Sequence, residues 1–440
     1  MRTADRQIGT RSVKLQKPAA ASGAFLWLTA FYVVYCARPE DWIPGLGSIP
    51  LAKIAGVFAL LALLTSLGKT QRKFRDLPRE SHCLVAMICV LFLSALFSPV
   101  WKAGALSNTE EFAKVWVIWT LTFLLVTDFA KLRRLIYIQS VSVAVISLVS
   151  IVLGHSRERL EGVIGGIYSN SNDLAFAIVL TLPFCLAFLL TAKGVLVRLC
   201  WTGGILVMGL ALFMTASRAG FISLVFSGTV CLWHFGVKGR RLYLIVASVL
   251  TIIILLAVAG RPLINRMAAM GGRVNTLEDN RAYGSYEERK YLMHRAIEGI
   301  ERYPVLGIGM RNFETYSGVW RDVHMTYLQI AVEGGIPSLI LYLLFFASAF
   351  RNLRKLRRNS DLDVQTTLFV GGLHSSMVGF VIGALFAPVA YQFFSYFYVA
   401  YTSVLEATIK ERDSVPGPFP VVKDWHSRYG IVRAPQKEIG

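Results

Sequence analysis

The chain has 440 residues, of which 55% are hydrophobic and only 17% are charged, and its formal net charge is +19. A typical soluble domain contains about 25% charged residues, so this composition excludes an ordinary soluble globule. Nucleic-acid binding is not indicated either, because most lysines and arginines lie between apolar blocks, where such residues act as membrane anchors.

Apolar residues occur in blocks about 20 residues long, the length that crosses a hydrocarbon core about 30 Å thick. In chain order these blocks predict transmembrane helices at 22–37, 49–68, 82–101, 112–130, 135–154, 173–191, 195–214, 219–236, 242–259, 325–350, 366–386 and 389–408. We therefore expect an all-α polytopic membrane protein with about 12 transmembrane helices. The first block follows a basic tail without a cleavage signal, which favours a retained helix over a signal peptide.

Lysine and arginine are concentrated in alternate loops. They are numerous in both terminal tails and in the loops at 69–81 and 351–358, whereas the opposite short loops hold few, such as Arg38 and Lys102. The positive-inside rule then predicts a multi-pass protein of a bacterial inner (plasma) membrane with both termini in the cytoplasm. The predicted division is a cytoplasmic N-terminal tail at 1–21, transmembrane helices 1–9 at 22–259, a periplasmic catalytic loop at 260–324, transmembrane helices 10–12 at 325–408 and a cytoplasmic C-terminal tail at 409–440.

The large periplasmic loop expected between helices 9 and 10 contains ten basic and eight acidic residues. It is too polar to span a membrane, and long ordered loops are usually functional. Ser285 and Glu288 have the spacing of a capping box, which predicts the start of an amphipathic helix, and Pro304 predicts its end. The residues expected to share one face of this helix are Arg289, Met293, Ala296 and Ile300.

Three residues on the expected periplasmic side are candidates for chemistry. Arg218 lies in a short turn between two predicted helices, where a lone arginine runs against the positive-inside bias. Arg289 lies on the loop helix, and His324 stands where the loop returns to the membrane. Arginine binds phosphate oxygens through paired hydrogen bonds. Two neighbouring cations should keep a histidine neutral and able to accept a proton.

Such a set suits the transfer of a sugar from a lipid pyrophosphate. The arginines would hold the departing pyrophosphate, while the base deprotonates an acceptor hydroxyl that attacks the anomeric carbon. The sequence shows neither the paired carboxylates of a glycosidase nor an HExxH-type metal motif. The six cysteines form no CxxC pair, so neither a disulfide framework nor a zinc site is expected. We therefore predict metal-independent catalysis without a cofactor.

Four motifs occur in a particular order along the chain. They are the asparagine-rich segment 168–175, the turn Ser217-Arg-Ala-Gly220, the stretch from Arg289 to Tyr303-Pro-Val-Leu-Gly-Ile-Gly309, and His324 followed by Gly335. This set, which covers roughly 160–345, resembles the hallmarks of O-antigen ligases and O-antigen polymerases. The resemblance implies a metal-independent transferase that takes glycans from undecaprenyl pyrophosphate. Arg218 and Arg289 would contact the pyrophosphate, and His324 would be the base.

Two positions depart from the family pattern. Met325 stands where an asparagine is usual, and this puts the positioning of the acceptor in doubt. Arg311 stands where small residues are more common, and we interpret it as an additional phosphate contact.

Arg38 and Asn172 are further candidates for substrate binding. For Arg38 the simpler alternative is an ion pair with Glu40 or Asp41. For Asn172 the simpler alternative is a cap at the start of a helix. His294 is a rival to His324 as the base, although it should point away from the face that carries Arg289.

The expected function is therefore that of an O-antigen ligase-type glycosyltransferase at the periplasmic face, with lipid A-core as the expected acceptor. The expected partners are the undecaprenyl-pyrophosphate-linked glycan donor, lipid A-core or another glycan acceptor, and membrane lipid. An O-antigen or exopolysaccharide polymerase of the same family is the closest alternative. A lipid-linked glycan transporter is disfavoured, because the two halves show no repeat symmetry and the notable residues cluster on one side.

Overall fold

The computed structural model of the chain describes residues 20–66, 70–154, 159–161, 168, 170–268 and 277–414, and the regular elements within these ranges are all helices. A helix lies at each of the twelve predicted apolar segments, so the all-α class is confirmed. These helices are α1 (Ala20–Ala37), α3 (Leu51–Ser66), α4 (Arg79–Leu96), α5 (Lys102–Leu125), α6 (Phe129–Leu153), α7 (Ser171–Thr191), α8 (Val195–Met214), α9 (Arg218–Leu232), α10 (Tyr243–Ala259), α14 (Thr326–Arg358), α15 (Val364–Gly383) and α16 (Phe393–Ser414). The predicted tails at 1–21 and 409–440 lie largely outside the described residues.

Seven segments are long and apolar enough to cross a membrane. They are α4, α6, α7, α8, α14, α15 and the combination of α9 with the π-helical turn η3 (Trp233–Val237). Two shorter apolar helices, Leu51–Thr65 within α3 and α10, add to this apolar surface. The chain is therefore a membrane protein. A total of twelve crossings and the side on which each loop lies remain predictions.

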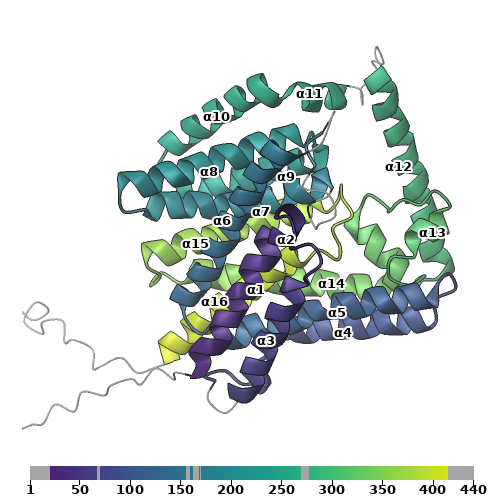
Figure 1. The fold of residues 1–440 in the computed structure, drawn as a ribbon, viewed down its shortest axis with the longest axis horizontal. Coiled ribbons are helices and arrows are strands. Elements are labelled where there is room, and N and C mark those ends of the chain that lie inside the picture. Colours follow the sequence, from purple (N-terminus) through teal and green to yellow (C-terminus); the bar gives the residue numbers. More distant parts are fainter. Residues whose placement is uncertain are drawn as a thin grey trace, which may run out of the picture.

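The helices pack around α7 and α15, which are the most deeply buried of the candidate spans. α15 contacts α9 and α7, α14 contacts α4, and α1 contacts both α3 and α6 (Figure 1). The aromatic-rich helix α16 contributes to this core, because Tyr396, Phe397, Tyr398 and Tyr401 are almost fully buried. α10 lies outermost against α8 and exposes most of its large apolar side chains, as a helix in contact with lipid would.

The described residues of the predicted periplasmic loop contain the helices α11 (Arg261–Ala268), α12 (Leu277–Arg302) and α13 (Phe313–Ser317). Figure 1 shows α12 standing across one end of the bundle, beside α13. The predicted end of the amphipathic helix before Pro304 is confirmed. Its predicted start at Ser285 is wrong, since α12 begins at Leu277. A serine inside a helix lowers its stability only slightly, so a capping pattern does not stop a helix that continues through it.

α12 buries one face in a small core of its own against α13 and α14. Leu292 and Ala296 are fully buried there, together with Phe313 and with Val332 of α14. Met293, which was predicted on the buried face, is 45% exposed instead. Ala296 and Ile300 do contribute to this core as predicted. The prediction fails at Met293, where the neighbouring Leu292 is buried instead, because neighbouring residues on a helix point about 100° apart.

Helix α14 is broken where the loop meets it. Gly335 has φ 75° and ψ 173°, and Pro337 follows within the helix. Proline has no N–H, so the carbonyl of Glu333 cannot accept its usual helical hydrogen bond. The N–H of Ile336 donates to Pro304 (2.8 Å) instead of to an α14 carbonyl. Two carbonyl groups of α14 are therefore left for another segment to bind.

The segment 303–309 supplies the missing donors. The N–H groups of Ile308 and Gly309 donate to the carbonyls of Val332 and Glu333, each at 2.9 Å. The glycine motif of this segment therefore forms a backbone-to-backbone joint with α14, which we call the α14 joint. The joint attaches the segment after α12 to α14, the helix that begins just after His324.

The α14 joint leaves no room for side chains at two of its glycines. A β-carbon at Gly335 would come within 2.2 Å of the carbonyl oxygen of Val305, and one at Gly307 would lie 2.6 Å from the backbone of Glu333. Both glycines also have positive φ angles, which other residues rarely adopt. The close approach of the two backbones thus depends on glycine at both positions.

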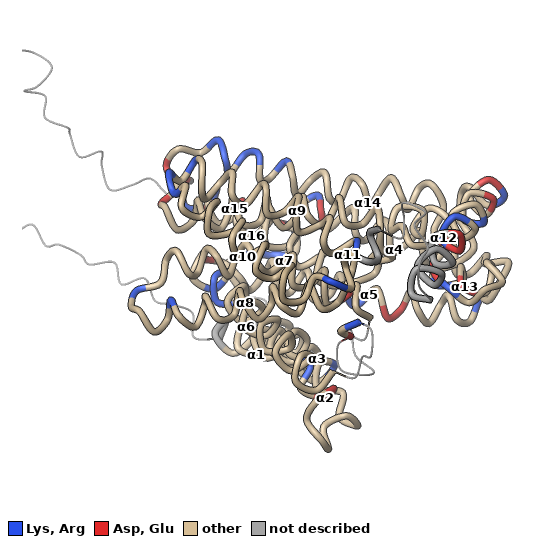
Figure 2. Tube along the Cα trace, turned by 90° about the horizontal axis from the view of Figure 1, so that it is seen from above, with Lys and Arg blue, Asp and Glu red and all other residues tan. Residues whose placement is uncertain are grey.

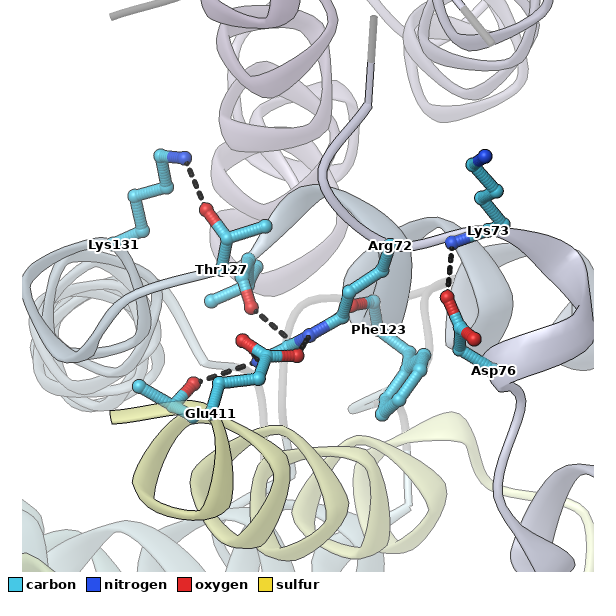
Figure 3. A network of polar contacts seen from close by, with 9 residues as sticks. Arg72, Lys73, Asp76, Phe123, Thr127, Lys131 and Glu411 are labelled. Carbon is cyan, nitrogen blue, oxygen red and sulfur yellow. Dashed lines mark hydrogen bonds and ion pairs between the residues drawn. The ribbon is translucent and has the colours of Figure 1, made fainter. Parts of the chain in front are cut away.

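Arg72, from the basic loop at 69–81, holds the other end of the bundle together (Figure 3). Its side chain is 2% exposed and lies over the Phe123 ring at 5.0 Å. It donates to the carbonyls of Phe123 and Val126 at the end of α5, at 3.0 and 2.8 Å, and to Glu411 of α16 at 2.7 Å. Because the last carbonyls of a helix have no partner within it, Arg72 caps α5 and ties it to α16.

We expect Gly335→Ala to weaken the α14 joint, because the new β-carbon would collide with Val305. A control is Gly318→Ala, which also has a positive φ of 81° but has open space around its β-carbon position. Thermal unfolding of the purified protein and limited proteolysis of the 303–309 segment would measure the effect. Gly335→Ala should melt at a lower temperature and be cleaved faster than Gly318→Ala; equal behaviour would contradict the joint.

We expect Arg72→Gln to lower the melting temperature, because two helix-end carbonyls lose their partner, at a cost of about 1–3 kcal/mol for each buried group left unpaired. Arg75→Gln is the matched control, since the Arg75 side chain lies in the same loop and is 79% exposed. Thermal unfolding in detergent would compare the two variants. If both variants lowered the melting temperature by the same amount, the loss of charge and not the loss of the cap would decide stability.

Candidate functional site

His324 lies just before α14 and is half-buried. Burial of the ring and the positive charges of Arg289, Arg321 and Arg218 together lower the pKa of its imidazole from 6.5 to about 4. The imidazole is therefore neutral at neutral pH and has a lone pair for a proton. The structure thus brings the three predicted catalytic residues together, with Arg321 as a fourth member of the His324 group.

The turn that precedes α9 presents Arg218 to this group. Ser217 is the N-cap of α9, and its Oγ accepts a hydrogen bond from the N–H of Gly220 (3.1 Å). A β-carbon at Gly220 would lie 2.6 Å from that of Ala175, so glycine lets the start of α9 lie directly against α7. Arg218 itself is 9% exposed. Burial sets it apart from a snorkelling anchor, whose guanidinium group would lie in water.

Asn172 supports the same turn from α7. Its Oδ1 accepts a hydrogen bond from the hydroxyl of Ser217 (2.7 Å), and its backbone N–H donates to the side chain of Asn170 (2.9 Å). The cap of α7 is therefore Asn170, whereas Asn172 holds the serine next to Arg218. In this arrangement Asn172 acts on the site by positioning the turn.

Arg289 lies on α12 and Arg321 in the segment before α14, and both act on His324 through their positive charges. Arg289 is half-buried, whereas Arg321 is exposed and forms an ion pair with Glu288 at 2.8 Å. Arg321 was missed from the sequence, although it lies only three positions before His324. The rival base His294 is exposed on α12.

Met325 is the N-cap residue of α14 and provides no side-chain cap. Thr326 holds this helix start instead. Its N–H donates to the carbonyl of Ala384 (2.9 Å), and its hydroxyl donates to that of Ala387 (2.7 Å) and accepts from the N–H of Val389 (3.0 Å). The segment between α15 and α16 therefore fixes the backbone next to His324, although the asparagine usual in the family is missing.

A cavity of about 880 Å³ lies between α1, α3, α5 and the starts of α7 and α16. Two predicted substrate-binding residues, Arg38 and Arg311, line it, whereas His324, Arg218 and Arg289 are not among its lining residues. Its other charged lining residues are Glu40, Lys53, Glu111, Lys114 and Asp173. Its apolar and aromatic lining residues include Phe31, Tyr35, Val57, Leu60, Val117, Ile118, Phe393 and Phe394.

Arg38 is the N-cap residue of the short helix α2 (Pro39–Trp42), which supplies its carboxylate partners. Its guanidinium group pairs with Glu40 (Nη1 to Oε1, 3.1 Å) and with Asp41 through two hydrogen bonds of 2.9 and 3.0 Å. The simpler interpretation of Arg38 as an ion-pair residue is thus confirmed. Its place in the cavity wall means that a ligand there would meet an arginine whose charge is already balanced.

Arg311 connects the cavity with the segment that precedes His324. It is exposed, and it lies within electrostatic reach of Asp173, Asp322 and Glu333. Burial raises the pKa of Asp322 to about 6, while Arg311 acts in the opposite direction. These three carboxylates were not predicted as part of the site; for Asp322 the available signal was its place two residues before His324.

Comparison with known proteins agrees with the motifs. The family model described as O-antigen ligase matches residues 203–343. The matched stretch contains the Arg218 turn, α12, the α14 joint and His324. No curated protein matches the chain. Residues 203–343 are thus similar to the O-antigen ligase family, in agreement with the resemblance of the motifs in this stretch.

Proposed function

We propose that the protein is an O-antigen ligase-type glycosyltransferase that moves a glycan from undecaprenyl pyrophosphate to an acceptor hydroxyl, with lipid A-core as the acceptor. One observation carries the proposal: a half-buried, neutral histidine lies among three guanidinium groups. A neutral imidazole accepts protons, and arginines bind anions. This combination fits a reaction that removes a proton from one oxygen and releases an anion at another.

In the proposed reaction His324 accepts the proton of the acceptor hydroxyl while its oxygen attacks the anomeric carbon of the donor sugar. The bond between that carbon and the pyrophosphate oxygen breaks, and undecaprenyl pyrophosphate leaves with the electron pair. The imidazolium formed on His324 then loses its proton to water. The products are the glycosylated acceptor, the lipid pyrophosphate and one proton.

Arg218 and Arg289 hold the pyrophosphate. Arg218 is suited to this role because its buried position, fixed by Ser217 and Asn172, keeps the guanidinium group in place before the substrate arrives. Donors arranged in advance for a developing anion contribute strongly to catalysis. Arg289 comes from α12, so the donor also links the loop helix to the bundle.

The cavity of about 880 Å³ suits an amphiphilic substrate. Arg38 and Arg311 both line this cavity, and Arg311 belongs to the 260–324 segment. Phe31 lies in α1, which ends just before Arg38. The rise of an α-helix places Phe31 about 10 Å from Arg38 along the helix axis. A polyprenyl or acyl chain could thus lie along the apolar wall, with its phosphate or sugar beside Arg311.

The proposed reaction takes place at the periplasmic face of the inner membrane, with both termini in the cytoplasm. The distribution of basic loops supports this orientation. Catalysis without a metal ion or cofactor is part of the proposal. It is supported by the chemistry of the His324 group, in which arginines can stabilise the leaving anion; within the described ranges no group of three or more His, Cys, Asp or Glu side chains is placed to hold a metal ion.

We expect His324→Ala to lower the rate of glycan transfer by about 10²- to 10⁴-fold, the usual contribution of a general base. The assay would use purified protein, a fluorescent undecaprenyl-pyrophosphate glycan and lipid A-core, with EDTA present. His294→Ala is the control, because His294 is exposed on α12, and it should keep the wild-type rate.

The product of this assay separates the alternatives. Glycan on lipid A-core would support a ligase, whereas longer glycans that remain on the carrier would identify a polymerase of the same family. Loss of activity with EDTA would contradict metal independence. Full activity of His324→Ala would rule out His324 as the base.

We expect the pH profile of kcat/KM to have an acid limb near pH 4, since protonation of His324 below its pKa removes the base. Arg321→Gln should move this limb to higher pH, because the imidazolium loses a repelling neighbour and the pKa of His324 rises. The unpaired carboxylate of Glu288 would act in the same direction. Transfer rates at low donor concentration between pH 4 and pH 8 would test this, and an unchanged limb would mean that another group titrates.

A further inference from the structure

A second basic cavity, of about 440 Å³, lies at the other end of α14 from His324. Its lining residues are Lys238, Phe350, Arg354, Arg357, Arg358 and His374. None of them is acidic. Within the part of the chain that the structure describes, its four Lys and Arg residues form no ion pair with a carboxylate. We call this cavity the Arg357 cavity; its cations lie at the end of α14 where Figure 2 shows Lys and Arg residues gathered.

Arg357 is held in this cavity by a neutral partner. Its Nη1 donates to Nε2 of His374 (3.4 Å), and Nδ1 of His374 lies 3.0 Å from Nε2 of His234. An arginine cannot accept a hydrogen bond, so Nε2 of His374 must carry a lone pair, and its proton is on Nδ1. His374 therefore donates to His234. The chain of bonds orients the guanidinium group without balancing its charge.

The sequence builds this pair of histidines through a local irregularity. His234 lies in the π-helical turn η3, and such turns often occur at functional sites. η3 approaches α15 closely because Gly371 has no side chain: a β-carbon there would lie 3.1 Å from that of His234. His234 and His374 are thus brought together by the packing of two helices.

The neighbouring basic cavity, on the other side of α14, is different in kind. Arg351 and Lys355 line it, but so do four carboxylates, from Asp76, Glu80, Glu406 and Glu411. Lys355 forms an ion pair with Glu406 at 3.0 Å. The two cavities therefore have similar cations, and only the Arg357 cavity lacks the anions that would balance them.

We propose that the Arg357 cavity binds the phosphate group of an anionic membrane lipid. Basic residues at helix ends often serve as anchors, but anchors need no common cavity and no histidine relay to hold an arginine. Basic pockets between transmembrane helices are suited to phosphate head groups. Trp233 and Val237, which neighbour His234 and the lining residue Lys238 in the sequence, are exposed and offer an apolar surface for the acyl chains.

The experiment uses the purified full-length protein in a neutral detergent and follows its melting temperature. Phosphatidylglycerol, phosphatidylcholine, and inorganic phosphate or pyrophosphate are added separately. We expect phosphatidylglycerol to raise the melting temperature of the wild type by roughly 3–6 °C, as a ligand that binds only the folded state would. Phosphatidylcholine, whose phosphate is balanced by its own cation, should have little effect.

Two double variants with the same change in charge locate the effect. Arg354→Gln with Arg357→Gln should abolish the shift, whereas Arg351→Gln with Lys355→Gln should retain it. Lys238→Gln provides a second test if the first double variant is unstable, because Lys238 is exposed; it should reduce the shift.

The outcomes are distinct. An equal shift with inorganic phosphate or pyrophosphate would overturn the lipid assignment in favour of a soluble anion. An equal shift in the two double variants, or no shift in the wild type, would overturn the site itself. Transfer activity is not part of the readout, so the test is independent of the proposed function.

Discussion

The break in α14 is the constraint on which the His324 group depends. Pro337 removes one helical hydrogen bond and Gly335 turns the backbone, so the carbonyls of Val332 and Glu333 accept N–H groups from the segment 303–309. A buried carbonyl left without a partner costs about 1–3 kcal/mol, so helix and loop stabilise each other. His324 lies just before α14, and α12 leads directly into this joint. The joint therefore sets where Arg289 stands relative to the imidazole.

Arginine has different roles in this protein, and its immediate neighbours decide which. Arg72 and Arg38 have carboxylate partners, so their charges are largely balanced and serve the fold. Around His324 the dominant charges felt by the imidazole are those of three arginines, which favour its neutral form. In the Arg357 cavity the partner is a neutral histidine. In that cavity the guanidinium group is oriented but not neutralised, and it is therefore ready for an external anion.

Much of the fold could be predicted from local patterns, because an apolar run or a proline determines the presence or the end of a helix within a few residues. Helices occur at each predicted apolar segment, and α12 ends before Pro304. The buried face of α12 was predicted wrongly at Met293, since packing against α13 and α14 decides which side is buried. The bond between Asn172 and Ser217 joins residues 45 positions apart, and no local pattern indicates it. The number of crossings stays a prediction, because several of the twelve helices carry charges or are short.

The charge balance of the proposed reaction explains why cations, and not a second base, surround His324. When the glycosidic bond breaks, the pyrophosphate gains negative charge while the imidazole becomes positive. The arginines therefore stabilise the departing anion more than the bound donor, which is the condition for catalysis. They also oppose protonation of His324, and the anion that forms beside them must offset that cost. Proton transfer and departure of the pyrophosphate are thus coupled through the same electrostatic field.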